Sequence, residues 1–328
     1  MTTQYKAFLV EEFEGKFSSS ITELERPQPQ KNEVLIKVEY SSLNYKDALY
    51  ASGNRGVTRE YPHTPGIDAV GEVVESNSSE FEVGEKIVVT GYDLGMNTSG
   101  GFGQYISIPA NWAISLPKDL SGAEAMSIGT AGLTAGLCVR KLLMNDLSPD
   151  SGDILVTGAS GGVGSVAVMI LSKLGFRVTA LTGKTDQIDY LKSLGASSVI
   201  MRSEMEELGK PLQKGIYQGG VDTVGGSILS NFISQTSQRG VITCCGNVAS
   251  DKLQTSVFPF ILRGVALIGI DSAESLLEVK KEIWNNFSSD WKLDLAKITK
   301  EVPLESLSDE IGKILQGNQI GRVRVNLG

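Results

Sequence analysis

Short stretches of alternating apolar and polar residues mark the chain as far as about residue 120. The clearest is Glu33–Tyr40, in which the apolar side chains of every second residue would share one face of an extended strand. The same composition predicts strands at Lys6–Val10, Asp68–Glu75, Glu85–Thr90 and Phe102–Pro109. Glycine and proline residues separate these stretches. The spacing predicts a compact β-rich domain whose sheet is closed or strongly coiled.

The pattern changes near Ser121, and Ala123–Leu143 has the texture of a helix rich in small residues. Beyond it, apolar runs with the length of buried strands alternate with helical segments. The expected strands are Ile154–Thr157, Arg177–Leu181, Ser198–Met201, Val221–Val224, Val241–Cys245 and Val265–Ile270, and the expected helices between them include Gly161–Leu174 and Asp186–Leu194. This alternation predicts an α/β fold with a doubly wound parallel sheet of the Rossmann type.

From about Ser272 the texture shifts to two amphipathic helices, Glu274–Phe287 and Leu304–Gln316, and then to an alternating strand, Arg322–Leu327. A strand that follows a finished sheet domain suggests that the tail returns to the first domain. We therefore expect a β-rich catalytic domain at residues 1–122 and 272–328. The Rossmann-type nucleotide-binding domain is expected at residues 123–271.

A glycine-rich turn within Asp153–Gly164, DILVTGASGGVG, joins the first strand of the parallel sheet to its helix. Its form is A-x-G-x-x-G, because Ala159 occupies the first glycine position of the usual dinucleotide-binding pattern. Gly161 would let the backbone approach a pyrophosphate, and Gly164 would let the helix pack closely on the strand. An ordinary strand, turn and helix without a ligand is the alternative. The flanking strand and helix favour a dinucleotide site.

The end of the second strand indicates which dinucleotide binds. NAD-binding units carry an acidic residue there, about 20 residues after the glycine turn, to bind the ribose 2′-hydroxyl. This chain has Thr182, Gly183 and Lys184 instead, and Arg202 follows the third strand. Cations at this place favour a 2′-phosphate, so we expect NADPH. The alternative for Lys184 is a solvated surface lysine, and the nearby Asp186 has the position of a helix cap.

Composition narrows the chemistry. The chain has 328 residues, a net charge of −8, one histidine and three cysteines. The negative charge argues against nucleic acid or an anionic membrane as a general partner, and we expect a cytoplasmic protein. A Ser-His-Asp mechanism would have to use His63, which is either packed in a turn-rich loop or catalytic. A zinc site of several His and Cys ligands is excluded by these counts, so we expect no metal.

Several motifs together resemble a known family. They are SSLNYKDAL at Ser41–Leu49, PGID at Pro65–Asp68, GTAGLTA at Gly129–Ala135, TGASGGVGS at Thr157–Ser165, YLKSLGA at Tyr190–Ala196 and FPFILR at Phe258–Arg263. The chain resembles the zinc-independent medium-chain dehydrogenases/reductases, and within them the YhdH/YhfP group of quinone oxidoreductases and acrylyl-CoA reductases. The resemblance implies a GroES-like catalytic domain beside the Rossmann-type domain, and a homodimer.

The resemblance also indicates where to look for the site. It places Tyr45 near the nicotinamide as the main catalytic candidate, where a phenol can hydrogen-bond or protonate a developing enolate. A tyrosine that only packs at a domain interface is the alternative. Asn44 and Asp47 would orient the same loop, and Asp47 can equally cap the short helix that follows.

The residues expected to contact the cofactor lie at the glycine turn, at the ends of strands, on the small-residue helix and in the C-terminal strand. They are Tyr45, Thr130, Thr134, Ser160, Gly161, Gly162, Val163, Thr182, Gly183, Lys184, Arg202, Gly246, Asn247, Ile270, Asp271 and Arg322. Thr130 and Thr134 would hold the carboxamide or only pack in their helix. Arg322 and Arg324 would steer an anionic group or be exposed strand residues.

These features lead to one hypothesis with two rivals. The hypothesis is NADPH-dependent reduction of an activated double bond, with acryloyl-CoA as the substrate and hydride transfer to its β-carbon. One rival is an NADPH:quinone oxidoreductase. The other is an NADPH-binding sensor or structural protein without turnover. The fold alone cannot separate them, because one architecture hosts many reactions.

Overall fold

The computed structural model describes residues 4–56 and 58–328, and the chain divides into two compact units. The first unit runs to Thr130 and resumes at Ala273, and the second comprises Ala131–Ser272. The first boundary lies eight residues beyond the expected residue 122, from 130 − 122, because a helix that begins at Gly122 runs across it. None of the helices in the described ranges has an apolar stretch long enough for a bilayer crossing.

The first unit is built on a coiled sheet. Its strands are β1 (Gln4–Phe13), β2 (Lys16–Glu25), β3 (Glu33–Leu43), β4 (Asp68–Ser76), β5 (Lys86–Thr90), β6 (Tyr105–Pro109), β7 (Ala113–Ser115), β14 (Thr299–Pro303) and β15 (Arg322–Asn326). Seven of them form one sheet in the order β14-β15-β3-β4-β5-β7, with β6 also paired to β3. The C-terminal strand β15 pairs antiparallel with β3, so the tail does return to the β-rich unit.

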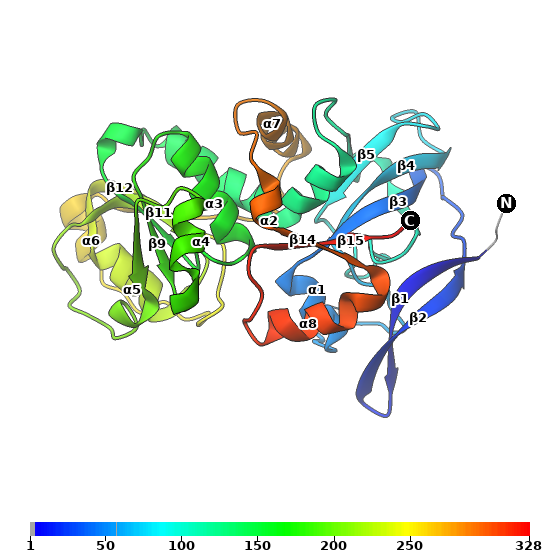
Figure 1. Ribbon diagram of the computed structural model, residues 1–328, viewed down its shortest axis with the longest axis horizontal. Coiled ribbons are helices and arrows are strands. Elements are labelled where there is room, and N and C mark those ends of the chain that lie inside the picture. The colour runs from blue at the N-terminus through cyan, green and yellow to red at the C-terminus, as the bar shows by residue number, and fades with distance from the viewer. Residues whose placement is uncertain (1–3, 57) are drawn as a thin grey trace. The chain divides into compact units, whose positions relative to one another are not determined.

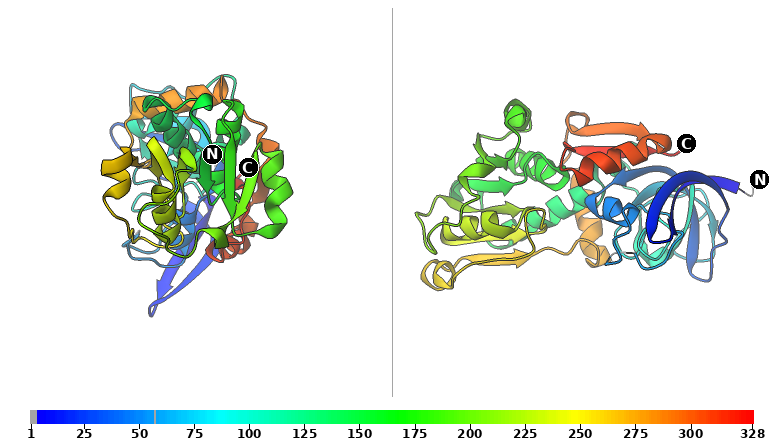
Figure 2. Two further views of the ribbon diagram at one scale, coloured as in Figure 1. Left: turned by 90° about the vertical axis from the view of Figure 1, so that its left-hand side faces the viewer. Right: turned by 90° about the horizontal axis from the view of Figure 1, so that it is seen from below.

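Strands β1 and β2 form a separate hairpin, which projects from the rest of its unit in the views of Figures 1 and 2 (dark blue). The helices of this unit are α1 (Tyr45–Ala51), α7 (Leu277–Ser288) and α8 (Leu307–Leu315). A core of apolar side chains from the inner faces of the strands, with Leu307 and Ile311 of α8, holds the unit together.

The second unit has a six-stranded parallel sheet in the order β10-β9-β8-β11-β12-β13. Its strands are β8 (Ile154–Thr157), β9 (Val178–Thr182), β10 (Ser198–Met201), β11 (Tyr217–Asp222), β12 (Thr236–Cys244) and β13 (Ala266–Gly269), and its helices are α3 (Gly162–Lys173), α4 (Ile188–Ser193), α5 (Gly226–Ser234) and α6 (Phe258–Arg263). Helices lie along this sheet in Figure 1 (green to yellow). The predicted doubly wound fold is confirmed, and its strand order reverses beside β8, where such sheets bind ligands.

Helix α2 (Gly122–Met144) connects the two units. Its helical geometry is broken at Gly129, where φ is 51° and ψ is −161°. A positive φ of this kind is accessible to glycine and costly for other residues. The predicted helix Ala123–Leu143 is therefore present, but it consists of two helical segments that join at Gly129.

Candidate functional site

One candidate cluster, within the first unit, is the start of helix α1, directly after strand β3. Asn44 is the residue before the helix, and its N–H donates to Asp47 Oδ2 at 2.8 Å. Asp47 also accepts the N–H of Ile67 at 2.9 Å, through Oδ1. Asp47 is fully buried. It therefore fixes the beginning of α1 by accepting backbone N–H groups of the turn and of the segment before β4.

Tyr45 lies at the first position of α1, between Asn44 and Asp47 in sequence. It is 42% exposed, whereas Asn44 is 8% and Asp47 0% exposed. At the helix start, Tyr45 is therefore partly exposed to solvent, whereas its neighbours Asn44 and Asp47 are buried and hydrogen-bonded to each other. The predicted catalytic candidate is accessible to a ligand, and its two predicted orienting residues are buried beside it.

A second buried acid, Asp68 at the start of β4, accepts hydrogen bonds from three segments of the chain. Its carboxylate accepts the Ser42 hydroxyl, the Asn44 side-chain amide at 2.7 Å, and both the N–H (2.8 Å) and the hydroxyl of Thr130. Asp68 was not among the predicted site residues. Two signals could have identified it: it is an acid at the first position of an apolar strand, and it is the last residue of the PGID motif at Pro65–Asp68.

Arg322 supplies the positive charge of this cluster and is 1% exposed. Its guanidinium donates to Ser42 Oγ at 2.8 Å, to Asn44 Oδ1 at 3.1 Å, and to the carbonyl oxygens of Leu43 and Ser127. Its Nη2 lies 4.0 Å from Asp68 Oδ2. The alternative of an exposed strand residue is wrong for Arg322, because β15 pairs with β3 and turns this side chain into the unit.

The pKa values of Asp47 and Arg322 depart from their ordinary values in this cluster. Burial, with a further contribution from the charge of Asp68, raises the pKa of Asp47 to about 7. Burial lowers the pKa of Arg322, and the charges of Asp68 and Asp47 act in the opposite direction. Each group has hydrogen-bond partners within the cluster, as buried charges require. The cluster thus holds Asn44 and Thr130 in place by hydrogen bonds to Asp68, and Tyr45 follows Asn44 directly in sequence.

A separate candidate cluster, within the second unit, is the glycine turn. Helix α3 begins at Gly162, so the N–H groups of Gly162 and Val163 belong to its first turn and have no partner within the helix. A Cβ on Gly164 would lie 2.3 Å from the carbonyl oxygen of Gly158. This close approach agrees with the packing role predicted for Gly164. The helix N-terminus and the glycines fit the pyrophosphate of a dinucleotide.

The turn after β9 lies next to the glycine turn, because β9 pairs with β8. The hydroxyls of Ser160 and Thr182 are 3.1 Å apart, and Thr182 Oγ1 accepts the N–H of Lys184 at 3.2 Å. A Cβ on Gly183 would lie 3.4 Å from the Arg202 guanidinium, so Gly183 leaves room for that side chain. The structure therefore brings together five of the predicted cofactor residues, Ser160, Thr182, Gly183, Lys184 and Arg202.

The remaining predicted cofactor residues lie at the carboxyl ends of β12 and β13. Gly246, Asn247, Ile270 and Asp271 line an open hollow of about 540 Å³, together with Cys244, Cys245 and Gly269. Thr134 is bound to the hydroxyl of Ser272 at 2.7 Å. Four predicted residues thus share one hollow at the sheet edge where ligands bind in this fold.

Sequence reasoning missed a third buried acid, Asp222 at the end of β11. It accepts the Thr157 hydroxyl at 2.7 Å and the N–H of Gly225 at 2.9 Å. Burial raises the pKa of Asp222, and these hydrogen bonds partly oppose the shift. An acid at the carboxyl end of a central strand is the signal that could have identified it. It ties the end of β11 to the end of β8, directly before the glycine turn.

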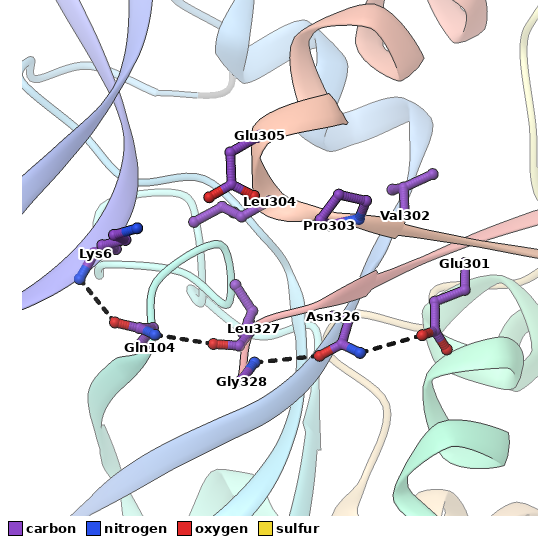
Figure 3. A pocket seen from close by; sticks show the side chains of 10 residues that line it. All are labelled: Lys6, Gln104, Glu301, Val302, Pro303, Leu304, Glu305, Asn326, Leu327 and Gly328. Carbon is purple, nitrogen blue, oxygen red and sulfur yellow. Dashed lines mark hydrogen bonds between the residues drawn. The ribbon is translucent and has the colours of Figure 1, made fainter.

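A more enclosed pocket of about 380 Å³ lies elsewhere in the first unit and is drawn in Figure 3. It is lined by Lys6, Gln104, Glu301, Val302, Pro303, Leu304, Glu305, Asn326, Leu327 and Gly328. Several of its polar groups bond to one another, as in the contact of Asn326 Nδ2 with Glu301 Oε1 at 3.1 Å. It contains none of the predicted site residues, and we assign the chemistry to the clusters described above.

Comparison with known proteins identifies the family. The model of the alcohol dehydrogenase GroES-like domain matches residues 30–118, and that of the zinc-binding dehydrogenases matches residues 162–289. YhfP of Bacillus subtilis, named as a quinone oxidoreductase, is 42% identical over 100% of both chains. Acrylyl-CoA reductase AcuI of Ruegeria pomeroyi is 38% identical over 98% of this chain and 99% of its own. The chain belongs to the medium-chain dehydrogenase/reductase family.

Solved structures of the YhdH/YhfP/AcuI group agree with this medium-chain dehydrogenase/reductase in fold. The yhdH oxidoreductase of Salmonella enterica, solved in complex with NADP, is 37% identical and has a TM-score of 0.96 over 98% of this chain and 100% of its own. The Bacillus subtilis protein yhfP, solved with NAD bound, is 42% identical and also has a TM-score of 0.96, over 99% and 100% of the two chains. The GroES-like and Rossmann-type units are thus shared over the whole length.

The name of one family model implies zinc, and the donor groups of this chain do not fit that metal. The single histidine, His63, is buried, and its Nε2 lies 2.7 Å from the carbonyl oxygen of Gly95. Burial lowers the pKa of His63 and raises that of Cys244. Across residues 4–56 and 58–328, no three His, Cys, Asp or Glu side chains are grouped so that they could hold a metal ion.

Proposed function

We propose that the protein is an NADPH-dependent reductase of an activated carbon–carbon double bond, with acryloyl-CoA reduced to propanoyl-CoA. The observation that carries the proposal is that Tyr45 is 42% exposed and lies beside the buried Asn44 and Asp47. In the part of the chain that the structure describes, no group of side chains could hold a zinc ion. Full-length similarity to an acrylyl-CoA reductase supports the substrate. A hydroxyl donor and rigid backbone are what hydride transfer to an unsaturated thioester needs from a protein that uses no metal.

When bound, NADPH would supply the hydride that adds to the β-carbon of the thioester. Negative charge then develops on the thioester oxygen. The Tyr45 hydroxyl would hydrogen-bond that oxygen or donate a proton at the α-carbon. Asn44 and Asp47 would act by holding the first turn of α1, because both are bonded to each other and not to solvent. Thr130, at the break in α2, would hold the carboxamide of the cofactor.

The choice of NADPH rests on charge. No acid stands in the turn Thr182-Gly183-Lys184, and the Arg202 side chain lies against it. Burial lowers the pKa of Lys184, and the nearby charge of Asp186 opposes this. A relative with 42% identity was solved with NAD, so the preference must be measured for this chain. A 2′-phosphate between Lys184 and Arg202 would gain charge-assisted hydrogen bonds that NADH cannot make.

The deciding experiment measures oxidation of NADPH and of NADH by the purified protein with acryloyl-CoA, crotonyl-CoA and a simple quinone. Rapid oxidation of NADPH with acryloyl-CoA, and little with the quinone, is the expected result. Oxidation with the quinone alone would contradict the proposal. It would favour quinone reduction, the activity for which the 42% identical YhfP is named. Tight NADPH binding without turnover for any acceptor would favour a sensor or structural protein.

We also propose that two copies associate through β13 and α6. Strand β13 is the last strand of its sheet, so one of its edges is unpaired within the sheet. Next to it in sequence, Val257, Phe258, Ile261 and Leu262 are exposed by 48–69%. Apolar side chains and an unpaired strand edge form a surface that a second, symmetry-related copy can cover.

A further inference from the structure

The carboxylate of Asp68 is the point at which three segments of the first unit meet. Strand β3 contributes Ser42, the start of α1 contributes Asn44, and the break in α2 contributes Thr130. Asp68 is 0% exposed, so water does not compete for these donors. An ionised carboxylate only accepts hydrogen bonds, and Arg322 stands 4.0 Å away to balance its charge. Each donor must therefore direct its hydrogen at Asp68.

The backbone of α2 is shaped for this contact. At Gly129, a Cβ would lie 2.6 Å from Asp68 Oδ2, 2.6 Å from Arg322 Nη2 and 2.4 Å from Ser42 Oγ. With φ at 51°, the chain turns there so that the next N–H, that of Thr130, reaches Asp68 Oδ2 at 2.8 Å. Asp68 thus caps the helical segment that begins at Thr130, from a strand that is distant in sequence.

We infer that Asp68 is a positioning residue of the reductase site, which orients the Thr130 hydroxyl and holds Asn44 beside Tyr45. The inference rests on the proposed function, in which Thr130 and Tyr45 contact cofactor and substrate. The Thr130 hydroxyl donates its hydrogen to Asp68, and this hydrogen bond fixes the orientation of the hydroxyl.

The test combines Asp68→Asn with Thr130→Val in a double-mutant cycle, measured as kcat and KM for NADPH and acryloyl-CoA. An asparagine keeps the shape but places an N–H₂ group where only acceptors fit. We expect kcat to fall about 100-fold in each single variant, the scale of a small misplacement at a reacting centre. The double variant should be no slower than the slower single variant, because both changes remove one interaction. Thr130→Ser, which keeps the hydroxyl, should restore most of kcat.

Glu310→Gln is the matched control, because Glu310 is also a buried acid of the first unit and is 4% exposed. It is bonded to Lys300 and Lys313 and not to the site. We expect Glu310→Gln to lower the midpoint temperature of thermal unfolding and to leave kcat unchanged. The inference would be overturned if the fold-loss of kcat in the Asp68/Thr130 double variant equalled the product of the two single-variant losses. So would a normal kcat in Asp68→Asn.

A second readout separates this inference from the proposed function. The N–H of Thr130 donates to Asp68, so its hydrogen exchange should be about tenfold faster in Asp68→Asn than in the wild type, even without a substrate. If the wild type oxidises NADPH with none of the acceptors, the proposed function fails and this exchange rate decides the role of Asp68. Unchanged protection of Thr130 would then contradict it.

Discussion

At the start of α1, three nearby side chains have two different roles. One is exposed and is the proposed proton donor, and the other two are buried and hold the turn in place. Asn44 and Asp47 are buried and bonded to the surrounding backbone, whereas Tyr45 between them is 42% exposed. The first turn of a helix produces this separation, because its successive side chains point in different directions. The identity of Tyr45 can therefore change with less effect on folding than that of its neighbours.

Replacing Tyr45 by Phe tests the chemical role of the hydroxyl. We expect kcat with acryloyl-CoA to fall by about 10²-fold or more, the usual contribution of a positioned acid, with little change in NADPH affinity. Steady-state kinetics and a fluorescence titration with NADPH measure the two effects. Tyr105→Phe, in strand β6, is the matched control and should retain kcat. Equal turnover of Tyr45→Phe and the wild type would exclude a chemical role for the phenol.

Asp47 makes stability depend on pH. Its pKa is raised to about 7 in the folded protein, from 3.8 as the ordinary value, so the folded state keeps a proton that the unfolded chain releases above about pH 4. This stabilising effect is complete below pH 4 and is lost as the pH rises through 7. Urea unfolding at pH 5 and pH 8 should show the wild type losing up to about 3 kcal/mol relative to Asp47→Asn, because about two pH units separate pH 5 from the folded pKa and one pKa unit is worth about 1.4 kcal/mol. A pH-independent difference would contradict the raised pKa.

At the scale of elements, periodicity predicted most of the strands, but it missed β7, β14, α5 and α6, and it missed or misplaced two further strands for physical reasons. Strand β2, Lys16–Glu25, was missed because most of its residues are exposed, so it lacks an apolar face. Strand β11 begins at Tyr217 instead of Val221, because Gln218, Gly219 and Gly220 interrupt the apolar run. Pairing with β8 and β12 holds those residues extended, which local sequence does not indicate.

The site was predicted unevenly for a similar reason. Residues at the glycine turn and the strand ends, such as Gly164 and Lys184, could be found because their roles follow from position within one βαβ unit. The role of Asp68 could not, because its partners Ser42, Thr130 and Arg322 come from segments that only the fold brings together. Single-sequence patterns report local geometry and not such contacts.

The packing of α3 on β8 gives a test at this scale. Gly164→Ala would place a methyl group 2.3 Å from the Gly158 carbonyl oxygen, so α3 must shift away from the turn. We expect NADPH affinity to fall at least tenfold and the free energy of unfolding to drop by about 1–3 kcal/mol, as for overpacked sites. Gly312→Ala in α8 is the control, because a Cβ there meets nothing within 4 Å. It should be neutral or stabilising by up to about 1 kcal/mol. Normal NADPH binding by Gly164→Ala would contradict the role of this glycine.

At the scale of the whole molecule, the proposed association through β13 and α6 predicts a change of mass. Ile261→Glu introduces a charge where the wild type exposes an apolar side chain by 69%. We expect the wild type to sediment as a dimer and the variant as a monomer at micromolar concentration, because burying an unpaired carboxylate is costly. Leu208→Glu, on an exposed apolar residue outside this surface, is the control. A wild type that sediments as a monomer would exclude the interface.

The return of β15 to β3 also sets an order for folding during synthesis. Ala131–Ser272 is continuous and can fold as soon as it has left the ribosome, whereas the first unit must wait for its last strand. Arg322 is made 254 residues after Asp68, from 322 − 68, which is about 13–50 s at 5–20 residues per second. During that interval Asp68 has no guanidinium beside it, and burying its unpaired carboxylate would cost free energy, so we expect it to stay hydrated. We expect residues 1–130, which are translated first, to complete their folding after Ala131–Ser272.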